Sequence, residues 1–321
     1  MSNELVSTHY FFSKQSAFNR GKVRDIYFIN DDLVALIATD RISAFDQVLP
    51  KSIPFKGQVL NQIASTFFDN TQHIVQNWKI AQPDPNVTIG LRCQPIPIEF
   101  VVRGYLSGHA WRLYQSGKRT ICGNKLPDGL LENDRLPKPI LTPSTKAENG
   151  HDQDISFADI EEQKILTKKQ IEKLERISRE LYAYGSQYAQ SKDLILVDTK
   201  YEFGIRDNKI FLIDEIHTPD SSRYFYAKDY LKIQKKDQQQ KQLSKEFVRK
   251  WLIENNFQGR EGENIPELSE KFINSVTERY VELFEKLTGK TFKKRSYENI
   301  EKDIEKSINQ FVESYYQQSG H

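Results

Sequence analysis

Two short apolar runs in the second half of the chain constrain its fold most strongly. They lie at 194–197 and 210–213, and the residues between them read DTKYEFGIRDNK. Short apolar runs around turn-forming residues predict the two strands of a β-hairpin. Asp198, Lys200 and Glu202 occupy every second position after the first run, so on a strand all three side chains project from one face. This charged strand face is the most informative part of the sequence.

The charged face is suited to a metal ion and an anion. Asp214 directly follows the second run, so pairing of the two strands brings a further carboxylate toward Glu202. Mg²⁺ takes a few carboxylate oxygens and completes its shell with water and substrate phosphates. Glu202 and Asp214 are therefore candidate magnesium ligands, and Lys200 is placed for an anion. A solvent-facing strand with alternating charges would show the same pattern, so this pattern alone does not distinguish a metal site from an exposed strand.

Local patterns predict several further elements. Two β-rich runs around an Asn-Asp turn predict a hairpin within 21–39, and apolar residues predict a strand at 96–102. A helix is expected at 58–68. Another helix begins at Thr167, where Gln170 three residues later completes a capping-box pattern. Apolar residues recur along it at intervals of three and four, which predicts one buried stripe.

Two long segments lack a strand pattern. Residues 117–150 are rich in Gly, Pro, Asn and Asp with little apolar periodicity, so they are predicted to be mostly loop. A loop of that length usually has a function. From residue 244 onward the pattern is helical, and the tail beyond about residue 259 is expected to pack against the larger lobe. The length of 321 residues allows one domain with lobes, or two domains.

The composition is that of a globular protein with little net charge. Lys and Arg total 46 against 44 acidic residues, so the field of the whole molecule would not recruit nucleic acid or an anionic membrane. No stretch approaches the roughly 20 apolar residues of a membrane span, and the first residues lack the layout of a secretory signal. A cytoplasmic location is expected. Cys93 and Cys122 are predicted to be ordinary buried thiols.

Two turns combine glycine with basic residues. GKVR at 21–24 heads the predicted N-terminal hairpin, where backbone N–H groups and two cations can cradle phosphate. It is not a Walker loop, which needs a longer Gly-rich turn before a helix, and an ordinary surface turn would look the same. Arg103 closes the strand at 96–102 and opens a Gly-containing turn, where it can meet an anion or pair with a structural carboxylate.

Hydroxyl groups and cations also gather at 142–146 and 217–223. The first segment, TPSTK, has three hydroxyls and a lysine, which suit an oxyanion but also a solvated loop. The second, HTPDSSR, combines a helix-cap pattern with Arg223, and hydroxyls beside a helix N-terminus favour phosphate. The sequence contains neither the nucleophile motif of serine hydrolases nor the glycine fingerprint of NAD enzymes.

Six segments follow one another along the chain: GKVRDIY at 21, TDRISAFD at 39, VVRGYLSG at 101, TPSTKAENGHD at 142, LVDTKYEFG at 196 and LIDEIHTPDSSRY at 212. Taken together and in this order, they resemble the SAICAR synthetase family of purine biosynthesis. The resemblance extends from about residue 20 to 255.

The resemblance implies an α+β fold with two lobes that grip ATP between them. Residues 1–100 would form an antiparallel β-rich lobe, and residues 101–321 a larger ATP-grasp-like α/β lobe with C-terminal helices. The implied activity is ligation of L-aspartate to the carboxylate of carboxyaminoimidazole ribotide, through an acyl phosphate, to give SAICAR, ADP and phosphate. ATP and Mg²⁺ would be required. Transfer of the phosphoryl group would depend mainly on positioning and electrostatics.

The resemblance also assigns expected roles to individual residues. The ATP contacts would be Gly21, Lys22, Val23, Arg24, Asp25, Thr142 and Lys146, and the metal ligands would be Glu202 and Asp214. The substrate contacts would be Arg103, His109, Asp198, Lys200, Ser222, Arg223 and Lys245. Among these, Asp198, Lys200 and Arg223 would be catalytic, with Lys200 facing the reacting carboxylate and Arg223 facing the sugar phosphate.

The chain departs from the family pattern at two places. Many members have serine where this chain has His109, whose imidazole could replace the serine contact or turn away. The family often has Asp-Lys-Gln where this chain has Ser244, Lys245 and Glu246, which affects the contacts around Lys245. The expected partners are small-molecule substrates, without nucleic acid or membrane, and the expected assembly is a monomer or small homo-oligomer.

Three other functions compete with the ligase. A small-molecule kinase with a related two-lobed fold would transfer phosphate to a hydroxyl and stop there. A catalytically inert nucleotide-binding protein would keep the fold for interaction, but such a scaffold has no need of Lys200, Glu202, Asp214 and Arg223 together. A nucleic-acid binder is poorly supported by the nearly neutral charge.

Overall fold

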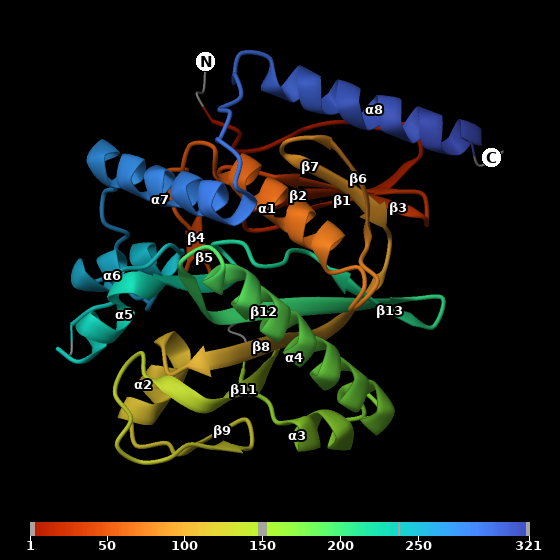
Figure 1. Ribbon diagram of the computed structural model, residues 1–321. Coiled ribbons are helices and arrows are strands. Elements are labelled where there is room, and N and C mark those ends of the chain that lie inside the picture. The colour runs from red at the N-terminus through yellow and green to blue at the C-terminus, as the bar shows by residue number, and fades with distance from the viewer. Residues whose placement is uncertain (1–3, 147–152, 237, 319–321) are drawn as a thin grey trace. The chain divides into compact units, whose positions relative to one another are not determined.

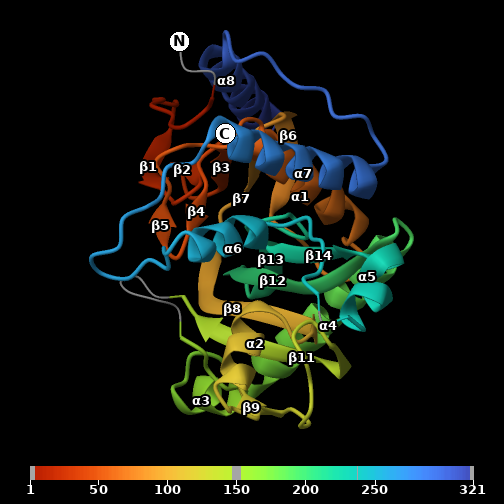
Figure 2. The ribbon, with the colours of Figure 1, turned by 90° about the vertical axis from the view of Figure 1, so that its left-hand side faces the viewer.

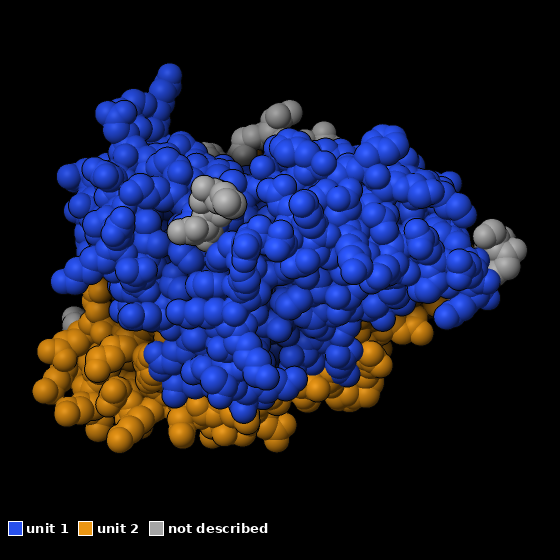
Figure 3. Space-filling model, turned by 90° about the horizontal axis from the view of Figure 1, so that it is seen from above, with its two compact units in different colours: residues 1–69, 78–93, 247–321 blue, residues 70–77, 94–246 orange. Residues whose placement is uncertain are grey.

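The computed structural model describes residues 4–146, 153–236 and 238–318 (Figure 1). The described chain is a mixed α+β protein with antiparallel sheets and C-terminal helices, as predicted. It divides into two compact units, which Figure 3 colours separately. Unit 1 comprises residues 1–69, 78–93 and 247–321, and unit 2 comprises residues 70–77 and 94–246.

Unit 1 is built on an antiparallel sheet with the strand order β1-β2-β3-β7-β6. Its strands are β1 (Gln15–Arg20), β2 (Arg24–Ile29), β3 (Leu33–Ala38), β6 (Lys79–Asp84) and β7 (Val87–Leu91), and β4 (Ser43–Ala44) pairs separately with β5 (Gln47–Val48). Its helices are α1 (Lys56–Asn70), α7 (Glu270–Thr288), α8 (Ile300–Gln318) and most of α6 (Glu246–Glu254).

Helix α8 covers one face of this sheet (Figure 1, Figure 2). Its apolar residues recur every four positions and form one buried cluster with residues of β2, β3 and β7; they are Ile300, Ile304, Ile308, Val312 and Tyr316. A sheet face of buried apolar side chains needs such a cover, and an amphipathic helix supplies it. The expectation that the tail packs against the larger lobe is therefore wrong for α8.

Unit 2 is built on a second antiparallel sheet with the order β11-β8-β12-β13, in which β14 also pairs with β12. Its strands are β8 (Gln94–Tyr105), β11 (Arg135–Thr145), β12 (Leu194–Arg206), β13 (Lys209–Ile213) and β14 (Ser222–Tyr226), with a separate pair of β9 (Thr120–Ile121) and β10 (Asn124–Lys125). Its helices are α2 (Gly108–Gln115), α3 (Phe157–Glu162), α4 (Lys168–Gln190) and α5 (Ala227–Gln234).

Most elements predicted from local pattern are confirmed. The structure contains the β2–β3 hairpin, helix α1, strand β8 and the helical tail. Helix α4 begins after Thr167. The Thr167 side chain accepts a hydrogen bond from Gln170 N, and the Gln170 side chain accepts one from Thr167 N, as the capping box predicts. The helix packs on the sheet through its apolar stripe, and the Tyr182 hydroxyl donates to Leu196 O at 2.8 Å.

Strand β11 corrects the prediction that residues 117–150 are mostly loop. The described part of that stretch contains an eleven-residue strand, β11, which pairs with β8 at Arg135 and again from Ile140 to Thr145. Pro137, Pro139 and Pro143 lower the strand signal of the sequence, because proline cannot donate to a sheet ladder. Strand β11 lies at the edge of its sheet, where proline is tolerated, so only the tertiary position explains the strand. Residues 147–150 lie outside the described residues.

Strand β12 is longer than the predicted hairpin strand. The run at 194–197 pairs with β14, whereas residues 202–206 pair with β13. Asp207 and Asn208 connect β12 to β13 with φ values of 50° and 57°, which suits the short turns of β-hairpins. The charged segment therefore lies at the centre of the sheet, with β8 along one edge and β13 or β14 along the other.

The compact units differ from the predicted division into residues 1–100 and 101–321. Residues 247–321 group with the N-terminal sheet, and β8 belongs wholly to unit 2. Cys93 and Cys122 are free thiols and are partly buried. Among the described residues, no helix has both the length and the apolar character to cross a membrane.

Candidate active site

Strands β8 and β12 place a lysine between two glutamates. Lys200 Nζ donates to Glu99 Oε1 at 2.6 Å and to Glu202 Oε1 at 2.5 Å. Glu99 and Glu202 lie directly opposite each other on the paired strands. Lys146, which follows β11, donates to the other carboxylate oxygen of Glu202 at 2.5 Å. The prediction that Lys200 and Glu202 share one strand face is confirmed.

These contacts fix the charge of each group. Burial alone would lower the pKa of Lys200, but Glu202 and Glu99 outweigh it and raise this pKa well above its usual value. Burial would raise the pKa of Glu202, but Lys200 and Lys146 outweigh it and lower this pKa. Lys200 is therefore an ammonium ion at neutral pH, so it can bind an anion but cannot accept a proton.

Asp198 pairs with two buried arginines in the same sheet. Its Oδ2 accepts from Arg103 Nη1 at 3.2 Å and from Arg223 Nη1 at 2.8 Å. Arg103 Nε also donates to Thr142 Oγ1 at 2.9 Å, and Arg223 Nη2 donates to Glu246 Oε2 at 3.0 Å. The two arginines come from β8 and β14, which flank β12. The sheet thus fixes two neighbouring guanidinium groups, which are suited to a phosphate or carboxylate ligand.

Gly108 gives Arg223 the space that it occupies. Its φ is +58°, and a Cβ at this position would lie 2.4 Å from Arg223 Nη2. The guanidinium cannot easily move aside, because Asp198 and Glu246 hold it. A side chain at position 108 therefore meets two obstacles, the left-handed backbone and the arginine.

We expect Gly108→Ala to destabilise the protein more than Gly289→Ala. Gly289 has a φ of +68° with nothing within 4 Å of its added Cβ, so this control carries only the backbone penalty, about 1 kcal/mol. Gly108→Ala should lose about 1 kcal/mol more, because a buried, hydrogen-bonded arginine must shift. Urea unfolding of both variants measures the difference. Equal losses would contradict the close approach of Arg223.

Glu202 and Asp214, the predicted magnesium ligands, are brought together by strand pairing. Glu202 lies opposite Ile213, the residue before Asp214, and the Asp214 charge contributes to raising the pKa of Lys200. Among the described residues, no group of three or more His, Cys, Asp or Glu side chains is arranged to hold a metal ion. Mg²⁺ bound with nucleotide phosphates needs only one or two carboxylates. The two residues therefore fit a magnesium ion that arrives with phosphates.

The other predicted substrate residues also lie in unit 2 and have polar partners. His109 Nε2 is 2.8 Å from Asp154 Oδ2, and this contact lowers the pKa of Asp154. Lys245 Nζ is 3.6 Å from Asp220 Oδ2. The buried Ser222 hydroxyl donates to a threonine hydroxyl on β12. His109 lies in the first turn of α2, and Arg103 lies within β8, which continues to Tyr105 before the chain enters that helix.

The helix-cap pattern at 217–223 does not begin a helix. Residues 218–221 form a turn in which Ser221 N donates to Thr218 Oγ1 at 3.2 Å, and the chain then enters β14. Serine and threonine hydroxyls stabilise such turns as readily as helix ends, so the pattern was ambiguous. His217 is buried against the Tyr201 hydroxyl at 2.8 Å, and burial lowers the pKa of His217 to about 3.

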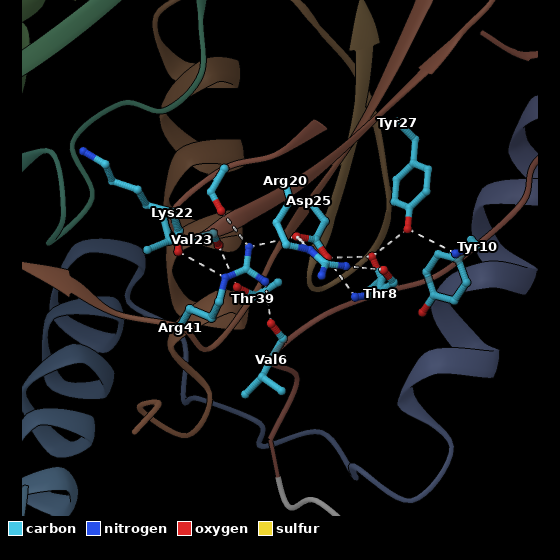
Figure 4. Close-up of polar contacts among 11 residues, drawn as sticks. Val6, Thr8, Tyr10, Arg20, Lys22, Val23, Asp25, Tyr27, Thr39 and Arg41 are labelled. Atoms are coloured by element: carbon cyan, nitrogen blue, oxygen red, sulfur yellow. Dashed lines mark hydrogen bonds and ion pairs between the residues drawn. The ribbon is translucent and has the colours of Figure 1, made fainter. Parts of the chain in front are cut away.

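The predicted ATP contacts at 21–25 lie in unit 1, at the turn between β1 and β2 (Figure 4). Gly21 N donates to Arg24 O at 2.8 Å and closes the turn. Lys22 Nζ donates to Asp46 Oδ1 at 2.5 Å. The Asp25 side chain has no exposed surface. Its carboxylate therefore belongs to the interior of unit 1, whereas the turn before it lies at the end of the hairpin.

Several partners of the candidate residues have no signal in the local sequence pattern. Glu99 and Glu246 hold Lys200 and Arg223, and Asp154 holds His109. Glu99 lies four residues before Arg103 on a predicted strand, so its side of the strand could have been deduced. Its position opposite Glu202 depends on the register between β8 and β12, which no local pattern specifies.

The sequence is similar to a known protein family and to named members of it. A model of the SAICAR synthetase family matches residues 17–265. The phosphoribosylaminoimidazole-succinocarboxamide synthase of Flavobacterium psychrophilum is 56% identical over 300 residues, which cover 93% of this chain and 95% of that protein. A chloroplastic synthase of the same name from Arabidopsis thaliana is 45% identical over 296 residues, which cover 90% of this chain and 71% of that protein.

Solved structures give the same result for the fold. The SAICAR synthase of Saccharomyces cerevisiae in complex with SAICAR matches with a TM-score of 0.76 and 32% identity, covering 90% of this chain and 99% of that chain. A SAICAR synthetase in complex with ADP matches with a TM-score of 0.67 and 25% identity, covering 86% of this chain and 100% of that chain. The family model and these relatives cover most of the sequence, so the chain belongs to the SAICAR synthetase family.

Proposed function

We propose that this protein uses ATP to join L-aspartate to the carboxylate of carboxyaminoimidazole ribotide, giving SAICAR, ADP and phosphate in purine biosynthesis. Family membership supports the reaction, and the solved relatives bound to SAICAR and to ADP support the ligands. The structural observation that carries the proposal is Lys200. It is held as an ammonium ion between two carboxylates, in a sheet that also fixes Arg103 and Arg223.

The chemistry needs activation of the ribotide carboxylate. A carboxylate is a poor acyl donor because an oxide ion would have to leave. Transfer of the γ-phosphoryl group of ATP to a carboxylate oxygen forms an acyl phosphate and releases ADP. The amine of aspartate then attacks the acyl carbon, phosphate leaves with its oxygen, and the amine loses a proton as the amide forms. Positioning and charge stabilisation are the main contributions that a protein makes to phosphoryl transfer.

The sheet residues of unit 2 supply fixed positive charge for this reaction. We assign Lys200 to the reacting carboxylate, where its raised pKa keeps it charged throughout. Arg223 binds the sugar phosphate. Arg103 and Asp198 also bind the ribotide, and Asp198 accepts hydrogen bonds from both guanidinium groups. Ser222 and Lys245 also contact the substrate. His109, which is held by Asp154, is a further substrate contact.

We assign two groups of residues to ATP: the turn at 21–25 in unit 1, and Thr142 and Lys146 in unit 2. Glu202 and Asp214 would hold Mg²⁺, which offsets the negative charge of the nucleotide phosphates when it is bound. Lys146 contacts Glu202, so this lysine can exchange its carboxylate partner for a phosphate as the nucleotide arrives. We further propose that this small-molecule ligase acts in the cytoplasm, as a monomer or small homo-oligomer.

The test is ADP release by purified protein with Mg²⁺-ATP, the ribotide and aspartate, with each component omitted in turn. We expect ADP only when all are present, together with an equal amount of the succinocarboxamide product. ADP formed with the ribotide but without aspartate, and without an amide product, would favour a kinase instead. Folded protein that releases no ADP with any combination would contradict the proposed function.

A further inference from the structure

Arg41 joins three separate parts of unit 1 through its guanidinium group (Figure 4). Its Nη2 donates to Gly21 O at 3.0 Å and to Asp25 Oδ1 at 2.8 Å, and its Nε donates to Lys22 O at 3.1 Å. Its Nη1 donates to Val6 O in the N-terminal segment. The side chain is largely buried, with 11% of its surface exposed. A planar guanidinium with a fixed fork of donors can hold several acceptors in one geometry.

The contacts of Arg41 fix the carbonyl side of the 21–24 turn. Two successive carbonyls, those of Gly21 and Lys22, accept from the one guanidinium. The next carbonyl, Val23 O, accepts from Thr39 Oγ1 at 2.8 Å and from Thr39 N at 3.1 Å. Thr39 and Arg41 come from the same segment after β3. Three carbonyls in a row are therefore held from one side.

Fixed carbonyls also fix the N–H groups of the turn. In a trans peptide unit the N–H points opposite to the C=O, and the described chain has no cis peptide bond. The N–H groups of Lys22 and Val23 share peptide planes with the two carbonyls that Arg41 holds, so both point away from Arg41. Within the described part of the chain, neither N–H donates a hydrogen bond. Successive N–H groups with one orientation form a concavity that binds anions.

Asp25 keeps Arg41 in place from the interior. Its carboxylate has no exposed surface and accepts from Thr8 N at 2.7 Å and Thr8 Oγ1 at 2.9 Å, as well as from Arg41. A buried carboxylate and a guanidinium stabilise each other through charge-assisted hydrogen bonds. The N-terminal segment, the hairpin turn and Arg41 are thus coupled through one carboxylate.

We propose that Arg41 is a positioning residue for ATP: it holds the 21–24 turn so that the Lys22 and Val23 N–H groups point toward the nucleotide phosphates. The inference rests on the proposed function, because it takes the turn to be the phosphate-binding element. Arg41 itself does not contact the phosphates. Without Arg41 the turn samples other orientations, and the apparent affinity falls with the fraction of binding-competent turns.

The chain offers a matched control in Arg20. Arg20 Nε lies 3.4 Å from Asp25 Oδ1, and its Nη2 donates to Thr8 O at 2.9 Å. It therefore shares the carboxylate and the N-terminal segment with Arg41, but among the described contacts it donates to no carbonyl of the turn. Arg20→Ala reproduces the loss of a cation beside Asp25 and leaves the turn held.

The first experiment compares binding of Mg²⁺-ATP and of adenosine to the full-length protein by calorimetry. In Arg41→Ala we expect ATP affinity to fall about tenfold or more, as for the loss of a charge-assisted hydrogen bond, while adenosine affinity stays unchanged. Arg20→Ala should bind both ligands like the natural protein. Arg41→Lys keeps the charge without the fork and should resemble Arg41→Ala. The proposal would be overturned if either Arg41 variant bound ATP as tightly as the unsubstituted protein. It would also be overturned if the affinities for ATP and for adenosine fell by the same factor.

A second measurement uses the natural sequence and does not depend on folding of a variant. Amide hydrogen exchange at Lys22 and Val23 should slow when Mg²⁺-ATP binds and should not respond to adenosine. Unchanged exchange in the ATP-saturated protein would overturn the role of these N–H groups. The omission assay separates this inference from the proposed function: a natural protein that binds ATP but forms no amide contradicts the ligase, whereas an active enzyme with natural ATP affinity in Arg41→Ala contradicts only the positioning role.

Discussion

Lys200→Ala is expected to lower kcat/KM for amide formation by at least about a thousandfold, because it removes the fixed cation that we assign to the reacting carboxylate. In the natural protein the Lys200 ammonium separates Glu99 from Glu202. Without it, the two carboxylates face each other across paired strands and repel the incoming carboxylate of the ribotide. The measurement is steady-state formation of the succinocarboxamide, with the unfolding free energy determined in parallel.

Two further variants make the Lys200 result interpretable. Lys209→Ala removes an exposed lysine from β13 of the same sheet, so it reproduces the change in net charge and should retain natural turnover. Glu99→Gln combined with Lys200→Ala relieves the repulsion between carboxylates. If the double variant stays inactive, the missing cation explains the loss. Near-natural turnover of Lys200→Ala itself would remove Lys200 from the mechanism.

Asp198→Asn should lower the unfolding free energy by about 3 kcal/mol, as for the loss of one partner from a buried ion pair. Asp198 Oδ2 accepts from both Arg103 and Arg223, and all three residues are less than a tenth exposed. Asparagine preserves the shape and one oxygen acceptor but removes the charge. The two neighbouring guanidinium groups then repel each other. Urea unfolding measures the loss.

The matched control for Asp198 is Asp207→Asn, at the turn between β12 and β13. Asp207 is exposed and has a φ of 50°, which asparagine tolerates well, so this variant should change stability by no more than about 0.5 kcal/mol. Sulfate should stabilise Asp198→Asn more than the natural protein, since an anion can compensate the arginine charge that Asp198 no longer neutralises. Natural stability of Asp198→Asn at low salt would contradict the paired-arginine arrangement.

Local chemistry predicted much of the fold and of the site. Alternation along β12 placed Lys200 and Glu202 on one face because the side-chain period of a strand does not depend on its partners. The capping box at Thr167 could also be predicted from local sequence, because all of its atoms lie within four residues. The order of family segments then linked these local features to a reaction.

The remaining features depend on contacts between distant residues. Strand register brought Glu99 to Lys200, sheet order made the proline-rich β11 an edge strand, and burial of a sheet face gave α8 its partner. The contacts of Arg41 with Val6 and Gly21 also span segments that have no common sequence pattern. The residue types that can do the chemistry, and the strand face that they share, follow from the order of residues along the chain. Their partners follow from the folded arrangement, because pairing register and packing are properties of distant segments brought together.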